Sequence, residues 1–327
     1  MRMLTYRDAI REALTEEMAR HPHMLILGED LIPQGGAWGV HKGLAELYPG
    51  RVRQTPISEA AIVGLAVGAA LAGGPVVVEL MFSDFATCSM DEIVNQAAKL
   101  RYMSGGQARV PLVVRAACGL GKGVAAQHSQ SLEAWFVHVP GLEVAMPATP
   151  ADAKGLLKTA IRGEDPVMFL EPKLLYAVEG PVPEGEYLIP FGQARICREG
   201  RDLTIVATGR MVQRALDAAG TLSEDGLDAE VIDPRTLVPF DWDALFASVE
   251  KTNRVLVVEE AVGRASVGAE IAATISEQRF GHLDGPVRRV SAPAVPKPFS
   301  PSLEKLSVPD VPDILRVARE MAGVRAS

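Results

Sequence analysis

Short apolar runs rich in β-branched residues alternate with helical patterns along most of the chain. The runs MLIL at 24–27, VVVEL at 76–80 and LEVAM at 142–146 are typical of buried strands. The segments between them carry apolar residues at helical spacing. Uninterrupted apolar strands separated by helices indicate a mostly parallel sheet that is covered on both faces. The sequence therefore predicts an α/β fold.

The alternation stops once, at residues 177–200, which are dense in proline, glycine and charge. This composition is typical of a linker, here with a strand or two of its own. The alternation resumes with DLTIVAT at 202–208 and continues to PVRRV at 286–290. We therefore predict two α/β domains, each a mostly parallel sheet covered by helices. The predicted bounds are 1–180 for the first domain, 181–200 for the linker and 201–327 for the second domain.

Composition excludes several classes of partner. A chain of 327 residues can bury two cores, and its net charge of −8 argues against a nucleic-acid groove or an anionic membrane surface. Cys88, Cys118 and Cys197 stand far apart, without metal-ligand spacing. The N-terminal residues are charged and lack the apolar core of a signal peptide. We expect a cytoplasmic protein with reduced thiols.

A single carboxylate, Glu59, opens an uncharged stretch that runs to Val78. This stretch approaches the length of a membrane span. Gly73, Gly74 and Pro75 interrupt it, however, and would end a helix near residue 72. The pattern predicts a buried helix followed by a strand, and no membrane span.

The common nucleotide and hydrolase motifs are incomplete or missing. GLGKGV at 119–124 lacks the last glycine of a dinucleotide fingerprint, because Val124 stands there. The same segment fails as a phosphate-binding loop, since Lys122 is followed by glycine instead of serine or threonine. No GxSxG elbow occurs. No complete motif in the sequence therefore supports a dinucleotide-binding enzyme, a phosphate-loop enzyme or a serine hydrolase.

A series of blocks along the whole chain carries a family resemblance. The blocks are LGED (27–30), TPISE (55–59), FSDF (82–85), DEIVNQAAKLRYMSGG (91–106), QHSQS (127–131), HVPGL (138–142), DAKGLL (152–157), DPVMFLEPKLLY (165–176) and IDPRTLVPFD (232–241). In this order they resemble the β subunit of the first component of 2-oxo acid dehydrogenase complexes, of the pyruvate, branched-chain or acetoin type. That family belongs to the transketolase-like superfamily.

The resemblance implies a thiamine diphosphate enzyme built as an α2β2 heterotetramer. The α subunit would hold the diphosphate through Mg²⁺, and this chain would hold the aminopyrimidine. The sequence agrees, since it lacks a GDG motif followed by an NN pair, the usual Mg²⁺ and diphosphate signature. The chain alone is therefore expected to be inactive. Its second partner would be the acyltransferase component that bears the lipoyl group.

Glu59 matches the family's catalytic glutamate. The resemblance implies that its carboxyl group, poorly solvated in an apolar wall, shares a proton with the pyrimidine ring and favours the imino form of the cofactor. The imino group then removes the proton of the thiazolium carbon. In the alternative interpretation, the negative charge of Glu59 only stabilises its own helix, by interacting with the positive end of the helix dipole. Such an interaction contributes roughly 0.3–1 kcal/mol.

The resemblance implies roles for three further side chains. Phe82 and Phe85 follow a strand end, where open α/β sheets bind ligands, and an aromatic of this segment would stack on the aminopyrimidine, with Phe85 as first choice. An aromatic at such a place can also belong to the core. His128 would line the lipoyl channel and assist acyl transfer, since a loop histidine can donate a proton near neutral pH. Its alternative role is to order a turn with Ser129.

A potassium ion is also implied. Relatives bind it through backbone carbonyls at positions that match Leu112, Ala160, Ile161, Gly163 and Asp165. The alternative interpretation of this segment is a simple helix end, because glycine ends helices well.

The second domain shows no comparable cluster of reactive groups. We expect it to serve subunit contact and docking of the acyltransferase, with Glu259, Glu260 and the C-terminal segment as candidates. Three functional interpretations stay open: the catalytic β subunit, half of a split transketolase, and a scaffold subunit without catalysis. Within the first, the sequence leaves the substrate open between pyruvate, branched-chain 2-oxo acids and acetoin.

Overall fold

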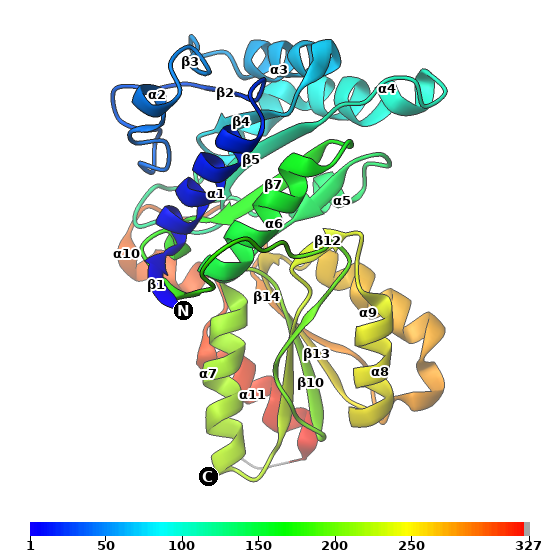
Figure 1. The fold of residues 1–327 in the computed structure, drawn as a ribbon. Helices are drawn as coiled ribbons and strands as arrows, with labels where there is room; N and C mark the ends of the chain where they lie inside the picture. The colour runs from blue at the N-terminus through cyan, green and yellow to red at the C-terminus, as the bar shows by residue number, and fades with distance from the viewer. Residues whose placement is uncertain (324–327) are drawn as a thin grey trace. The chain divides into compact units, whose positions relative to one another are not determined.

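The computed structural model describes residues 1–323, which divide into two compact units. The first unit contains residues 1–118 and 135–191, and the second contains 119–134 and 192–327 as far as they are described. Figure 1 shows the first unit mainly in blue to green and the second mainly in yellow-green to red. The sequence-based bounds at 180 and 200 stay a prediction, but the membership of 119–134 in the second unit was not foreseen.

The first unit is built on a parallel sheet with strand order β6-β7-β5-β4-β2-β3, in which every pair is parallel. This confirms the predicted parallel sheet. Its strands, with the separate antiparallel pair β1 and β8, are β1 Arg2–Thr5, β2 Leu25–Gly28, β3 Val52–Gln54, β4 Val76–Leu80, β5 Leu112–Cys118, β6 Glu143–Ala145, β7 Val167–Pro172 and β8 Glu179–Val182.

Helices cover this sheet and fill one core around Ile10, Val77 and Phe169. The helices are α1 Tyr6–Arg20, α2 Leu44–Leu47, α3 Glu59–Gly73, α4 Ala98–Met103, α5 Glu133–Val137, which begins in the second unit, and α6 Pro150–Arg162, with 3₁₀ turns at Ser83–Ser89 and Lys173–Leu175 and a π-helix at Glu92–Ala97. Buried apolar side chains from both helices and strands make up that core, as the alternating pattern requires.

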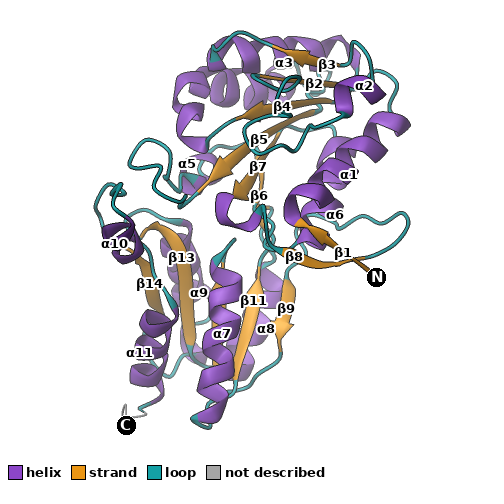
Figure 2. Cartoon of the chain, turned by 90° about the vertical axis from the view of Figure 1, so that its left-hand side faces the viewer, coloured by secondary structure: helices purple, strands orange, loops and turns teal. Residues whose placement is uncertain are grey.

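The second unit is also α/β. Its sheet has the order β14-β13-β10-β11-β9, parallel except for the edge strand β9. Figure 2 shows helices α7, α8, α9 and α11 alongside these strands. The elements are β9 Arg195–Arg198, β10 Leu203–Ala207, α7 Met211–Glu224, β11 Ala229–Asp233, β12 Thr236–Val238, α8 Trp242–Thr252, β13 Val255–Val262, α9 Val267–Gln278, β14 Arg288–Ala292, α10 Pro301–Glu304 and α11 Val311–Ala322, with 3₁₀ turns at Phe280–His282 and Lys305–Ser307.

Helix α3 differs from its prediction in one respect. It begins at Glu59 and ends at Gly73, as the glycine and proline residues indicated. It is not buried all round, however, because Ala61, Leu65 and Gly68 are exposed on one face. An exposed apolar face on a helix that carries no charge beyond its first residue is typical of a contact surface for another chain. Among the described residues, no helix is both long and apolar enough to cross a membrane.

Candidate functional site

Glu59 is the first residue of α3 and is half-buried. The carbonyl of Ser58 accepts the first helical hydrogen bond, from the amide of Ile62 at 2.8 Å. The carboxylate therefore lies at the positive end of the helix dipole. The residues before it are exposed, Ile57 to 78%. Part of the Glu59 side chain is thus open to solvent or to another chain.

A second carboxylate, Glu29, lies near Glu59. It follows β2 directly, at the carboxyl edge of the sheet, and only 9% of it is exposed. Burial raises the pKa of Glu29, and the negative charges of Glu59 and Asp30 raise it further. Its Oε2 atom is buried and finds no hydrogen-bond partner among residues 1–323. Glu29 was not among the residues predicted for the site, although a carboxylate directly after a buried strand was the available signal.

Phe82 and Phe85 both lie in the turn that follows β4, and both are half-buried. Their ring centroids are 5.4 Å apart and their planes meet at 74°, an edge-to-face contact. Trp38 extends this group, with its ring edge-on to Phe82 at 5.8 Å and stacked on Tyr176 at 5.2 Å. The two phenylalanines were predicted from the sequence, but Trp38 was not, because it lies in an irregular part of its loop.

A buried charged cluster lies in the strands that carry this edge of the sheet. Arg115 of β5 donates to both oxygens of Glu171 in β7, at 2.7 and 2.8 Å, and to Glu79 of β4 at 3.2 Å. Tyr176 donates to Glu171 at 2.6 Å. These side chains are buried, so each charge depends on its partners. The cluster thereby fixes the spacing of three neighbouring strands.

The cluster also holds the loop that carries Trp38. Nε2 of His41 lies 3.0 Å from Nη1 of Arg115, and the amide of Ala37 donates to Glu79. Burial lowers the pKa of His41 well below its usual value, and the Arg115 charge lowers it further. Burial raises the pKa of Glu79 to about 7, against the opposing effect of Arg115. Gly36 has φ +81°, and a Cβ there would collide with Oε1 of Glu79, so this loop needs glycine to approach the carboxylate.

The residues expected to bind potassium lie close to one another at one end of the first unit. Ala160 and Ile161 are in the last turn of α6, Gly163 is its C-cap, Asp165 follows, and Leu112 starts β5. Gly163 therefore does end the helix. The amide of Gly163 already donates to the carbonyl of Ala160 at 3.2 Å, and the carboxylate of Asp165 contacts Arg101 at 2.6 Å. This segment can thus offer its backbone carbonyl oxygens as ligands for potassium, but not the side chain of Asp165.

His128 lies in the segment 119–134, which belongs to the second unit. The amide of His128 lies 3.4 Å from the carbonyl of Ala125, a residue with φ +62°. The base of the segment is closed by the amide of Gly119, which donates to the carbonyl of Gln130 at 2.9 Å. The structure therefore presents His128 on a closed loop.

Glu259 and Glu260 are not surface residues, contrary to their expected part in docking. They are 1% and 6% exposed. Glu259 accepts hydrogen bonds from Ser266, Gly268 and Ser291, all within the second unit. No local sequence pattern indicates this burial, because a carboxylate that follows an apolar strand run can point into the core or into solvent. The described residues contain no cluster of His, Cys, Asp and Glu that could hold a metal ion.

Comparison with known proteins covers both units. The profile of the transketolase pyrimidine-binding domain matches residues 2–179, and that of the transketolase C-terminal domain matches 192–314. The chain is 48% identical to "Acetoin:2,6-dichlorophenolindophenol oxidoreductase subunit beta" of Cupriavidus necator, over 98% of this chain and 97% of that protein. It is 47% identical to "Pyruvate dehydrogenase E1 component subunit beta" of Rickettsia felis, over 97% and 98%.

Solved structures agree with these matches. A chain described as "Split gene transketolase, inactive beta4 tetramer" superposes with a TM-score of 0.81 at 25% identity, covering 99% of both chains. Transketolase from Leishmania mexicana shares the fold, with a TM-score of 0.73, and this chain covers 46% of it. Both domain profiles match the chain, and the two relatives quoted above are close to half identical to it over almost its whole length. The chain therefore belongs to the transketolase-like family that includes the β subunits of pyruvate and acetoin dehydrogenases.

Proposed function

We propose that the chain is the β subunit of a thiamine diphosphate-dependent 2-oxo acid dehydrogenase. The complete enzyme decarboxylates a 2-oxo acid oxidatively and transfers the acyl group to the lipoyl group of an acyltransferase. One observation carries the proposal. A half-buried carboxylate, Glu59, opens the apolar helix α3 beside the buried Glu29, at the carboxyl edge of a parallel sheet. The two β subunits quoted above, each close to half identical over almost the whole chain, support it.

The residues present fit the aminopyrimidine half of the cofactor. Glu29 has a buried oxygen that finds no partner among residues 1–323, and Glu59 is open on one side. Phe82 and Phe85 offer half-buried aromatic rings in the turn after β4. A flat heteroaromatic ring that carries a proton suits carboxylates on one side and an aromatic face on the other. When bound, thiamine diphosphate supplies the carbanion that attacks the 2-oxo group.

Each of these side chains has a defined task in the proposal. Glu59 holds a proton against the ring nitrogen, and Glu29, whose pKa is raised by burial and by the charge of Glu59, lies beside it as a second carboxyl group. Phe85 orients the ring by stacking, and Phe82 supports Phe85 through their edge-to-face contact. Carboxylates of this kind act in general acid–base catalysis.

The Glu59→Gln variant of the assembled enzyme tests the assignment. We expect it to retain fold and assembly and to lose turnover by at least about 10²-fold, since glutamine cannot hold the proton. Glu46→Gln, on the exposed side of α2, is the matched control and should behave as the wild type. The measurement is 2-oxo acid-dependent reduction of 2,6-dichlorophenolindophenol. Wild-type turnover in Glu59→Gln would refute the proposal.

We further propose that His128 assists transfer of the acyl group to the lipoyl arm. Its loop position suits contact with an incoming group, and a histidine can give or take a proton near neutral pH. His128→Ala should lose lipoyl acylation while decarboxylation, read with the dye, persists. Equal loss of both would contradict a specific role.

The proposed partners are an α subunit and the acyltransferase that bears the lipoyl group. In the α2β2 heterotetramer, the α subunit holds Mg²⁺ and the diphosphate. The exposed apolar face of α3 supports such an assembly, because Leu65 and Leu71 are 57% and 44% exposed with no charge nearby on the helix. The proposed compartment is the cytosol, which suits three free thiols.

The proposal includes a potassium ion at the carbonyls of Leu112, Ala160, Ile161, Gly163 and Asp165. Carbonyl groups at a helix C-terminus lack helical partners and are hard oxygen donors, which suits a monovalent cation. The carbonyl of Glu164, within this segment, accepts from Val110 at 3.0 Å and so links it to the start of β5. A rise in thermal stability with K⁺ but not with Li⁺ is the expected result.

Acetoin dehydrogenase is the second candidate function, because the relative at 48% identity is named as an acetoin oxidoreductase subunit. Half of a split transketolase has weaker support, since that structure is 25% identical. Co-expression with the α subunit and assay against pyruvate, branched-chain 2-oxo acids and acetoin separates the candidates.

A further inference from the structure

The loop that carries His128 is attached to the second unit by carboxylates. The amide of Leu120 donates to Oε1 of Glu260, in β13. The amide of Gly123 donates to both oxygens of Glu304, at 3.0 and 3.2 Å, at the end of α10. Both carboxylates are nearly buried, at 6% and 7% exposure. Two acidic side chains thus bind the backbone of one loop.

These contacts depend on close approach of the loop backbone. Gly119 has φ +73°, and a Cβ there would lie 2.7 Å from Oε1 of Glu260. Gly123 also has a positive φ, of +70°. Glycine is therefore required where the loop approaches the carboxylate, and it allows the turn at the second anchor. The glycines of GLGKGV, which do not complete a nucleotide motif, have this structural use.

Positively charged side chains lie near Glu260, the first of these carboxylates. Nη1 of Arg210 lies 3.4 Å from Oε2 of Glu260. Lys297 is buried and interacts electrostatically with Glu260 and Glu133. A buried carboxylate that accepts a backbone amide makes a stronger hydrogen bond than a neutral acceptor does. Two such bonds, together with the bond from Gly119 to Gln130, hold the loop at its base and along its first half.

We propose that Glu260 and Glu304 are positioning residues, which hold the segment 119–131 so that His128 can serve acyl transfer. This inference rests on the proposed role of His128. It assigns to the domain that matches residues 192–314 a part in the lipoyl step, through two carboxylates that hold the loop of His128. A small displacement of a reacting group can lower a rate by about 10²-fold, so loosening the anchor should be visible.

The test uses the assembled α2β2 enzyme with Glu304→Ala, Glu304→Gln and the milder Glu304→Asp. Hydrogen–deuterium exchange of the peptide that covers 119–131 reports the anchor directly. We expect Glu304→Ala to speed its exchange about tenfold and to lower the ratio of lipoyl acylation to dye reduction about tenfold. Glutamine retains a carbonyl acceptor and should restore most of both values. Aspartate, with its shorter reach, should give intermediate values.

Glu277→Ala, at an exposed position of α9, is the matched control and should change neither value. His128→Ala, measured in parallel, separates the two hypotheses. If His128→Ala keeps lipoyl acylation, the proposed role of His128 fails. If it loses acylation while all Glu304 variants match Glu277→Ala in exchange and in ratio, the positioning inference is overturned. Should Glu304→Ala fail to fold, Glu304→Gln and Glu304→Asp decide by the same two measurements.

Discussion

Arg115 links three neighbouring strands of the first sheet through its hydrogen bonds. It is 1% exposed and binds Glu171 through two hydrogen bonds and Glu79 through a third. We expect Arg115→Met to destabilise the chain by about 3–5 kcal/mol, because two buried carboxylates lose their counter-charge. Urea unfolding followed by circular dichroism measures this. Arg109→Met, at an exposed ion pair, should cost about 1 kcal/mol or less. Similar losses in both variants would argue against the buried cluster.

Glu133 gives a pH-dependent prediction. Burial, helped by the charges of Glu259 and Glu260, raises its pKa to about 7, against the lowering effects of a backbone hydrogen bond and of Lys297. The folded chain therefore keeps a proton that the unfolded chain has lost, and its stability falls as the pH rises from about 4.5 to about 7.

The Glu133→Gln variant removes this titration. It should be more stable than the wild type above pH 7, by up to roughly 3 kcal/mol, and should differ little near pH 4.5. Thermal unfolding of both proteins at pH 5 and pH 8 checks the difference. A gain that is equal at the two pH values would contradict the raised pKa.

In the sequence, a motif or a strand end singles out Glu59, Phe82 and Phe85, and the roles of these three residues stay predictions. Glu29 and Trp38 were missed, because the first was treated only as part of a block and the second lies in an irregular loop. Charges inside apolar strands, such as Arg115, were also passed over, although a buried charge always requires a partner. The pairing itself depends on strand order, which a single sequence does not contain.

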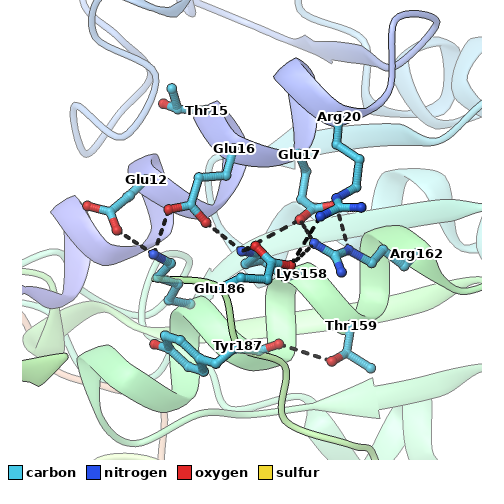
Figure 3. Close-up of polar contacts among 12 residues, drawn as sticks. Glu12, Thr15, Glu16, Glu17, Arg20, Lys158, Thr159, Arg162, Glu186 and Tyr187 are labelled. Atoms are coloured by element: carbon cyan, nitrogen blue, oxygen red, sulfur yellow. Dashed lines mark hydrogen bonds and ion pairs between the residues drawn. The ribbon is translucent and has the colours of Figure 1, made fainter. Parts of the chain in front are cut away.

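At the scale of elements, α1 and α6 are joined by ion pairs across their contact (Figure 3). Nζ of Lys158, whose side chain is 0% exposed, lies 2.6 Å from Glu186 and also contacts Glu16. Arg162 binds Glu17 through two hydrogen bonds, at 2.9 and 2.6 Å. These pairs bring together the two helices and the segment that follows β8.

We expect Lys158→Met to cost about 1–2 kcal/mol of unfolding free energy. The loss is smaller than for a fully buried pair because Glu16 and Glu186 are partly exposed and regain water. Chemical denaturation measures it. Arg316→Met, which removes an exposed pair with Glu320, is the control and should stay within about 0.5 kcal/mol of the wild type. An equally small effect at Lys158 would show that the α1–α6 pairs add no stability.

Element boundaries followed from local chemistry. Glycine and proline after residue 72 ended α3 as expected, and the interrupting segment does contain the strands β8 and β9. The helical segment between β4 and β5 divides into a π-helix, Glu92–Ala97, and α4. The sequence pattern could not show this, because π-helical turns are rare and this one is too short to establish a period of its own. The alternation of helices and strands was sufficient to predict both parallel sheets.

At the scale of the whole molecule, the chain order does not match the division into units. Residues 119–134 follow β5 of the first unit but belong to the second. Backbone amides of this segment donate to Glu260 and Glu304, which lie more than 130 residues further along the chain. No local sequence pattern indicates contacts between residues so far apart in the chain. The sequence therefore predicts two domains, but not that residues 119–134 belong to the second unit.

The exposed face of α3 yields the prediction for assembly. Ala61, Leu65, Gly68 and Leu71 are exposed and uncharged, and Leu65 is 57% exposed. Burying such a face against the α subunit stabilises the assembly through removal of apolar area from water, about 25 cal/mol per Å². Leu65→Lys would place a charge in that contact, where its desolvation is unfavourable.

We therefore expect Leu65→Lys to keep its own fold, since the side chain points away from the core, and to fail to form the heterotetramer when co-expressed with the α subunit. Size-exclusion chromatography with light scattering gives the mass, and circular dichroism verifies the fold. Leu47→Lys, at a 62% exposed position of α2, is the control and should assemble normally. If Leu65→Lys forms a heterotetramer of wild-type mass and stability, then α3 does not contact the α subunit, and another surface must close the open side of Glu59.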